Sequence, residues 1–262
     1  MGKSTRIVAR GSMLLTAVAV SAGLSAQASE RPLLVERATV LPQGAIGIHG
    51  NVAYEIGREA GFPGPDGETG DYDNLRMGPV GVRGGLGDRF EVGGYLTANI
   101  NSEDDDGAPD ESGLEGLTGY GKLSLNDYFA LTVGMTVAGS DDVGPYPNDG
   151  IDFFVNLPMQ RPLGVGLVYG ELGYTIQDND VGGGYMNYGL GYALPVEDQL
   201  TLNAELVGEE SNTGFRAGNS MSLVFGAGFH PEPNIDLMPY ASVGLYDAAP
   251  DVAIGASFEV RM

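Results

Sequence analysis

The chain has 262 residues, a formal net charge of −22 and no cysteine. The absence of thiols excludes a disulfide framework, a cysteine nucleophile and a cysteine-ligated metal. The acidic balance argues against nucleic acid as a partner, because phosphate binding needs clustered lysine and arginine, and the length suits one large all-β domain or two small ones.

The first 28 residues have the three parts of a secretory signal peptide. Lys3, Arg6 and Arg10 form a positive region, residues 13–24 (MLLTAVAVSAGL) are apolar, and residues 26–28 (AQA) fit a cleavage site. The alternative is an N-terminal membrane anchor, but the apolar run is well short of the ~20 residues that a spanning helix needs. Residues 1–28 are therefore expected to be removed during export.

Residues 29–43 (SERPLLVERATVLPQ) precede the first regular pattern and are expected to be a periplasmic N-terminal segment. They form either a short periplasmic tail or a plug that tucks into the lumen of the domain that follows. The sequence leaves both alternatives open.

From residue 44 to the end, the chain alternates between apolar and polar positions. In residues 89–101 the even positions from Phe90 to Ile100 are apolar or small, while the odd positions from Glu91 to Asn99 are polar or glycine. This is the period of a β-strand. Segments of this kind have ~9–13 residues, about twice the usual strand of a soluble protein and long enough to cross a bilayer when tilted. About twelve are predicted, at residues 44–57, 75–86, 89–101, 114–125, 128–139, 150–161, 164–177, 185–195, 199–209, 220–229, 235–246 and 252–262.

The connections between these segments alternate between short turns and long acidic loops. The short turns lie at residues 87–88, 126–127, 162–163, 195–198 and 230–234. The long loops, rich in glycine and proline, lie at residues 59–74, 102–113, 140–149, 178–184, 209–219 and 247–251. Short turns on one side and long loops on the other are typical of an outer-membrane barrel, and an even number of strands places both termini on the short-turn, periplasmic side.

We therefore predict an all-β fold in residues 44–262, a transmembrane antiparallel up-and-down β-barrel of about 12 strands. The apolar faces would contact lipid and the polar faces would line a wet lumen, since only a closed sheet satisfies its backbone polar groups in hydrocarbon. The alternative is a soluble secreted β-sandwich, in which the same alternation faces a dry core. Strand length and loop alternation favour the barrel.

Two stretches resemble a bacterial outer-membrane family named for the meta-pathway of phenol degradation, whose members are often labelled transporter. Residues 80–96 (VGVRGGLGDRFEVGGYL) resemble its strand–turn–strand motif, and residues 36–55 (ERATVLPQGAIGIHGNVAYE) resemble the entry into its first strand. The positions that match the hairpin motif are Arg83, Gly85, Leu86, Asp88 and Glu91. The resemblance implies a barrel of the 12-stranded type and transport of small, often aromatic, molecules.

The last strand, residues 252–262, has the alternating apolar pattern that the outer-membrane insertion machinery recognises, so this machinery is an expected partner. The chain departs from the usual signal at its end, where Met262 replaces the terminal aromatic residue and Phe258 lies four positions earlier.

Ionisable and aromatic side chains gather on the polar faces of the predicted strands. They form either a constriction that selects solutes by charge and shape or a network that fills and stiffens a narrow lumen. Arg83 and Glu91 flank one short turn and are expected to pair across the hairpin. The candidates for the lumen and constriction are Arg83, Glu91, Tyr95, Tyr120, Lys122, Tyr169, Glu171, Glu205 and Arg261.

The long loops hold more than half of the acidic residues, which would favour cations at that mouth of the barrel. Within them, Glu103, Asp104, Asp105 and Asp106 are weak candidates for a divalent-cation site, because they supply oxygen ligands but lack the spacing of an EF-hand loop. An acidic run is usually only solvated, so no metal is predicted.

Catalysis is not supported by any motif. The chain has two histidines; His49 lies within the first predicted strand and His230 in the short turn at 230–234, and neither has a nucleophile motif beside it. We therefore predict no enzymatic activity and no cofactor.

The predicted function is passive passage of small molecules, including hydrophobic or aromatic ones, through a barrel in the outer membrane of a Gram-negative envelope. Its expected partners are outer-membrane lipid and a small-molecule solute. Two other classes stay open: a closed structural or adhesion-type barrel that presents acidic loops, and a barrel enzyme that acts on lipid.

Overall fold

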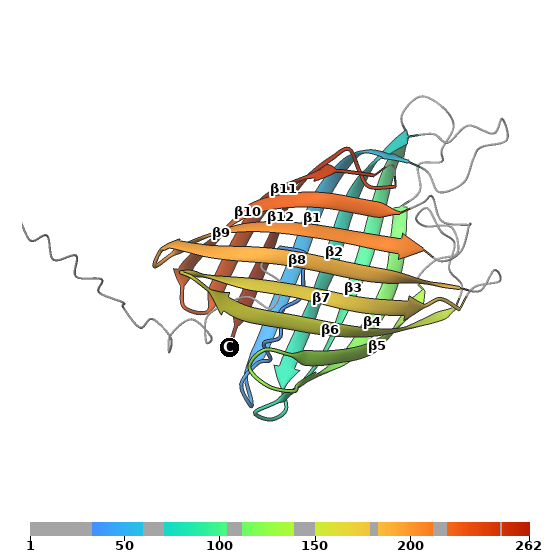
Figure 1. The fold of residues 1–262 in the computed structure, drawn as a ribbon. Coiled ribbons are helices and arrows are strands. Elements are labelled where there is room, and N and C mark those ends of the chain that lie inside the picture. The colour runs from blue at the N-terminus through green and yellow to red at the C-terminus, as the bar shows by residue number, and fades with distance from the viewer. Residues whose placement is uncertain are drawn as a thin grey trace, which may run out of the picture.

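The protein is described by a computed structural model in residues 33–59, 71–103, 112–138, 150–178, 183–211, 219–246 and 248–262. Twelve antiparallel strands each pair with the next along the chain, and the first pairs with the last to close a barrel (Figure 1). The predicted fold class is therefore confirmed. The strands are β1 (Ile46–Glu59), β2 (Asp71–Gly85), β3 (Phe90–Glu103), β4 (Ser112–Ser124), β5 (Ala130–Ala138), β6 (Ile151–Leu163), β7 (Gly166–Ile176), β8 (Gly184–Glu197), β9 (Leu200–Ser211), β10 (Ser220–Glu232), β11 (Ile235–Gly244) and β12 (Val252–Arg261).

The strands have 9 to 15 residues, and five short turns join them at one end of the barrel. The C-terminus and the start of β1 lie at this same end, which we call the short-turn end; the opposite end is the long-loop end (Figure 1). Three of the predicted turns lie too early in the chain. Residues 162–163 belong to β6 and residues 195–197 to β8, so those turns are residues 164–165 and 198–199. His230 belongs to β10, which continues to Glu232, so the turn before β11 contains only residues 233–234.

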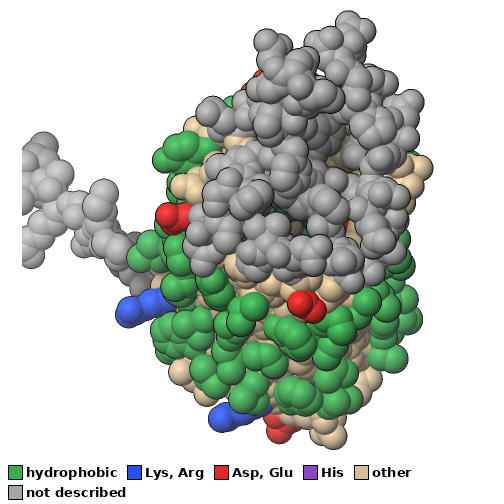
Figure 2. Space-filling view, turned by 90° about the vertical axis from the view of Figure 1, so that its right-hand side faces the viewer, with side chains coloured by type: hydrophobic (Ala, Val, Ile, Leu, Met, Phe, Trp, Pro, Cys, Tyr) green, Lys and Arg blue, Asp and Glu red, His purple; other side chains and the backbone are tan. Residues whose placement is uncertain are grey.

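The outer wall of the barrel is apolar. Large hydrophobic side chains stand at alternate positions and are exposed, among them Val82, Val133, Leu190 and Ile254. Figure 2 shows such side chains covering the wall in that view, with few charged side chains between them. Exposed apolar area on this scale is unfavourable in water and favourable against lipid. None of the described residues forms a helix that is long and apolar enough to cross a membrane.

Glycines make room for aromatic rings along the wall. A Cβ atom added at Gly191 would lie 2.4 Å from the Tyr169 ring, and one at Gly255 would lie 2.4 Å from the Tyr240 ring. In each pair the glycine stands directly opposite the aromatic residue on the neighbouring strand, so the ring covers the backbone. The same cross-strand pairing joins Gly50 with Phe258, Gly93 with Tyr120, Gly134 with Phe154, and Gly208 with Tyr188.

The ladder between β1 and β2 is interrupted halfway along the wall. Pairing stops between His49 and Val52 of β1, where β2 carries Gly78 and Pro79. Proline has no N–H to donate, and Gly78 has φ +133°, a backbone conformation that other residues rarely adopt. His49 and Pro79 of this bulge line the cavity described below.

Candidate functional site: an occluded lumen

The N-terminal strap, which we define as residues 33–43, lies inside the barrel as far as Leu41, and its last two residues are exposed. Leu33, Val35 and Leu41 are buried, and so are the charged Glu36 and Arg37. The apolar side chains form small cores with inward-facing residues of the wall: Leu33 packs with Val224 and Met238, and Val35 packs with Tyr169. The hydrophobic residues of this segment therefore fill the lumen of the barrel.

The backbone of the strap is held by carboxylates of the barrel wall. Glu205 accepts hydrogen bonds from the N–H groups of Leu33 (3.2 Å), Leu34 (2.8 Å) and Val35 (3.0 Å). Glu171 accepts one from Glu36 (3.0 Å), and Glu91 accepts one from Leu41 (2.8 Å). An irregular segment has no ladder partners for its N–H groups, so the wall supplies them.

The Glu36 side chain anchors the strap a second time, on the other side of the lumen. Its carboxylate lies 2.9 Å from Lys122 Nζ and accepts hydrogen bonds from Thr132 Oγ1 (2.7 Å) and Asn156 Nδ2 (2.8 Å). Lys122 also donates to the carbonyl oxygen of Arg37 (2.6 Å). Lys122 and Glu36 are almost completely buried, and a buried charge is tolerated only when it is paired in this way.

A chain of ion pairs continues around the short-turn end of the lumen. Arg83 bridges Glu91 (2.9 Å) and Glu259, so the predicted pairing of Arg83 with Glu91 is present. Arg261 lies 2.6 Å from Asp236 and 3.6 Å from Glu259. Together these side chains tie β2, β3, β11 and β12 to one another.

His230 ends this chain of polar contacts. Its Nδ1 lies 2.6 Å from Asp236 Oδ1, and its Nε2 lies 3.2 Å from Thr201 Oγ1. The order hydroxyl, imidazole, carboxylate is also that of a hydrolase triad. Here Asp236 is shared with Arg261 and the hydroxyl belongs to a β-branched threonine inside a strand. The contacts therefore connect β9, β10, β11 and β12 into one network.

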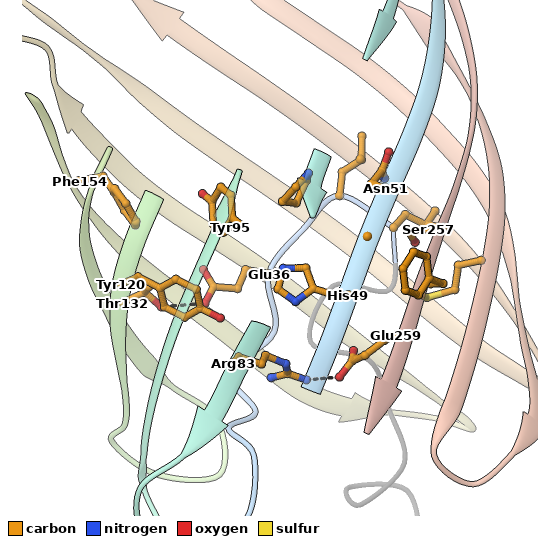
Figure 3. A pocket seen from close by; sticks show the side chains of 16 residues that line it. Glu36, His49, Asn51, Arg83, Tyr95, Tyr120, Thr132, Phe154, Ser257 and Glu259 are labelled. Carbon is orange, nitrogen blue, oxygen red and sulfur yellow. Dashed lines mark hydrogen bonds and ion pairs between the residues drawn. The ribbon is translucent and has the colours of Figure 1, made fainter. Parts of the chain in front are cut away.

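A cavity of ≈ 80 Å³ remains beside the strap. His49, Tyr95, Tyr120 and Phe154 give it aromatic walls, with ring centroids 6.4 Å apart for His49 and Tyr95 and 6.3 Å apart for Tyr95 and Tyr120 (Figure 3). The strap contributes Leu33, Leu34 and Glu36, and the wall adds Asn51, Arg83, Ser257 and Glu259. A cavity with aromatic walls and a few polar groups suits a small, partly apolar molecule.

A second polar cluster lies nearer the long-loop end. Arg58 Nη1 and Asn74 Nδ2 donate to Glu55 (2.6 and 3.0 Å), and Arg76 Nη2 donates to Glu115 (3.3 Å). The side chains of Arg76 and Glu115 are 40% and 36% exposed. This cluster does not contact the strap through any hydrogen bond between described residues.

The structure brings the candidate residues of the sequence analysis together in the lumen. Each of Arg83, Glu91, Tyr95, Tyr120, Lys122, Tyr169, Glu171, Glu205 and Arg261 stands at an inward-facing position, and most of them contact the strap or the cavity. The side chains of Glu103, Asp104, Asp105 and Asp106 lie outside the described part of the chain, and no group of acidic or histidine ligands suited to a metal occurs within that part.

Sequence reasoning missed the partners that the strap supplies. Glu36 and Arg37 lie outside any periodic segment, so no face could be assigned to them. A usable signal was the apolar content of PLLVERATVL at residues 32–41, which is unusual for a tail in water. Glu259 could also have been predicted to face the lumen, because it lies on the same face of its strand as Arg261.

Comparison with known proteins supports the fold. No protein-family model matches the chain, and no curated protein matches it. Among solved structures, it is similar to an outer-membrane channel from Pseudomonas putida F1, with a TM-score of 0.62 and 16% sequence identity. That match covers 85% of this chain and 97% of the channel.

Two further barrels match less closely. A NanC porin has a TM-score of 0.50 at 10% identity, covering 83% of this chain and 100% of the porin. The translocator domain of the autotransporter NalP from Neisseria meningitidis has a TM-score of 0.50 at 15% identity, covering 85% and 90%. At such identities the likeness shows a shared fold, that of outer-membrane β-barrels.

Proposed function

We propose that the protein is an outer-membrane channel for small molecules, including hydrophobic or aromatic ones, and that the strap closes it in the conformation described. The proposal rests on what obstructs the lumen, which is the strap. The lumen is blocked by a segment that enters from the short-turn end and is held by hydrogen bonds and ion pairs, not by side chains of the wall alone. In the proposed channel this segment leaves the lumen to open it.

The orientation follows from the two ends of the barrel. In the proposed arrangement the short turns and both termini face the periplasm, and the long acidic loops face the outside. Residues 1–28 would direct export and be cleaved, and β12 would carry the signal for the insertion machinery. The acidic mouth would attract cations and repel anions.

The class of solute follows from the cavity. Its aromatic rings offer stacking and edge contacts, while Asn51 and Ser257 offer single hydrogen bonds. Such walls suit an uncharged molecule of about one ring in size better than a strongly hydrated ion. The similarity to the Pseudomonas putida F1 channel supports a channel of some kind and does not specify the solute.

The test is conductance in a planar bilayer. The mature chain, residues 29–262, is compared with a variant that lacks residues 29–41, each verified as a folded barrel by its heat-dependent mobility in electrophoresis. We expect small or intermittent currents from the complete chain and larger, steady currents from the variant. A folded variant that conducts no ions would contradict the channel and favour a structural barrel.

A cysteine pair supplies a matched control, because the chain has no thiol of its own. A Cβ atom at Gly189 would lie 2.6 Å from Val35 Cγ2, so a Val35→Cys, Gly189→Cys double variant places two thiols within disulfide reach. Oxidation should fix the strap and abolish conductance, and a reductant should restore it. The Val35→Cys single variant should not respond to oxidant.

A further inference from the structure

Glu205 is a residue of the barrel wall on which three hydrogen bonds from the strap converge. Three consecutive backbone N–H groups of the strap donate to its carboxylate, and Tyr169 donates its hydroxyl to the same group at 2.7 Å. The side chain is 1% exposed. The three N–H groups can only donate and the Tyr169 hydroxyl can donate too, so together they favour a group that only accepts hydrogen bonds, an ionised carboxylate.

No lysine or arginine among the described residues forms an ion pair with Glu205. This distinguishes it from Glu36 and Glu91, which are paired with Lys122 and Arg83. The negative charge of Glu205 is therefore balanced by the N–H groups of the strap and by the Tyr169 hydroxyl. Hydrogen bonds to an ionised acceptor are about twice as strong as neutral ones.

A protonated Glu205 would bind the strap less strongly. The strap N–H groups cannot accept its O–H, which only the Tyr169 hydroxyl could receive, and the carboxyl group would lose the charge that strengthens the remaining bonds. We propose that Glu205 is a proton-operated latch, which holds the strap in the lumen when ionised and releases it when neutral. This inference rests on the proposed channel function.

Other titratable groups face the latch from the elements around it. On β7 they are Tyr169 and Glu171, and Glu171 is close enough to interact electrostatically with Glu205. Tyr240 on β11 also interacts with it, while β8 and β10 place Gly191 and Val224 opposite it. The strap contributes Glu36, which hydrogen-bonds through its N–H to Glu171, and Arg37, whose guanidinium lies 5.9 Å from the Tyr169 ring centroid. His230 and Asp236 lie further toward the short-turn end.

The direction of the pH effect follows from the charge of the acceptor. The carboxylate form binds the strap, so binding is complete above the pH at which Glu205 titrates and is lost as the pH falls through it. Glu171 and Glu91 also accept strap N–H groups, so acid would weaken their bonds as well. A substitution at Glu205 separates its contribution from theirs.

The experiment measures conductance against pH for the mature chain and for Glu205→Gln. Glutamine keeps the size of the side chain and removes its charge. At neutral pH, Glu205→Gln should raise the mean current about tenfold or more, because losing one charge-assisted hydrogen bond corresponds to at least that factor. The variant should also lose most of the opening that acid produces in the parent chain.

Glu115→Gln is the matched control, since Glu115 faces the lumen beside Arg76 and makes no hydrogen bond to the strap in the described structure. It should keep the parent current and pH response. His230→Gln and His49→Gln should keep the pH response too, because the proposal assigns it to a carboxylate. If Glu205→Gln does not fold, Tyr169→Phe serves instead: removing the hydroxyl donor should move acid opening to higher pH.

The outcomes separate the latch from the channel. Suppose that Glu205→Gln stays closed at neutral pH while the variant without residues 29–41 conducts. That result would overturn the latch but leave the channel function standing. A pH response lost in His230→Gln and kept in Glu205→Gln would also overturn it. A variant without residues 29–41 that folds and stays silent would reject the channel function itself.

Discussion

Two arginines with acidic partners inside the barrel illustrate how burial decides the value of an ion pair. The side chain of Arg83 is 3% exposed and bridges Glu91 and Glu259, which are 0% and 2% exposed. Arg76 and Glu115 are far more open to water. Solvent screens an exposed pair, whereas a buried charge that loses its partner has no replacement.

Arg83→Ala should therefore destabilise the barrel by about 3–5 kcal/mol, because it removes the nearest cation of two buried carboxylates and leaves Glu259 only Arg261, at 3.6 Å. Arg76→Ala should change the free energy of unfolding by only about 0–1 kcal/mol. Urea unfolding in detergent micelles, followed by loss of heat-dependent mobility, measures both. Equal effects of the two variants would contradict this reading of burial.

A substitution at Gly189 tests how closely the strap packs against the wall. A Cβ atom there would lie 2.6 Å from Val35 Cγ2, so in Gly189→Ala the buried Val35 side chain must shift, and we expect this to loosen the strap. At Gly119, by contrast, an added Cβ meets nothing within 4 Å. In the proposed channel, Gly189→Ala should raise the conductance of the mature chain and Gly119→Ala should not, as measured in planar bilayers. An unchanged current in Gly189→Ala would mean that the strap does not limit conduction.

At the scale of elements, the strands were predictable and the strap was not. Each strand has lipid on one side and a polar lumen on the other. The alternation of apolar and polar residues therefore predicts which side chains face lipid and which face the lumen. This is why the inward direction of Arg83, Lys122 and Glu205 could be read from parity. The strap has no period, and its contacts join residues as far apart as Leu33 and Glu205, so its place in the lumen could not be read in the same way.

The pairs of glycine and aromatic residue carry a prediction about strand packing. An alanine at Gly255 would place its Cβ 2.4 Å from the Tyr240 ring on the neighbouring strand, whereas one at Gly84 would have 3.9 Å to its nearest neighbour. Overpacking of this kind typically costs about 1–3 kcal/mol. Gly255→Ala should lower the urea midpoint of unfolding, and Gly84→Ala should leave it nearly unchanged. Similar midpoints would show that the ring moves aside without loss.

At the scale of the whole molecule, charge is the dominant property. The chain carries 35 acidic against 13 basic residues, and the long loops concentrate the acidic ones at one end. If the barrel conducts as proposed, the reversal potential in a salt gradient should show cation preference, and the preference should weaken as ionic strength rises.

Neutralising residues 103–106, by Glu103→Gln with Asp104→Asn, Asp105→Asn and Asp106→Asn, should reduce that preference without closing the barrel. The measurement is the shift in reversal potential of the variant that lacks residues 29–41, with and without these changes. Retention of the full preference would place the selectivity in the lumen, where Glu55, Glu115 and Asp152 are acidic residues of the described wall.

The position of the strap in the chain also constrains assembly. The strap leads directly into β1, and β1 pairs with β12 at the seam that closes the sheet. Its anchor on β9 lies 172 residues further along the chain for Leu33. Contacts of such long sequence separation form only after much of the sheet exists. The strap therefore docks late. In a refolding experiment with pulses of hydrogen exchange, its amide protons should become protected after those of the strands. The growing barrel then keeps a wet interior until the strap enters it.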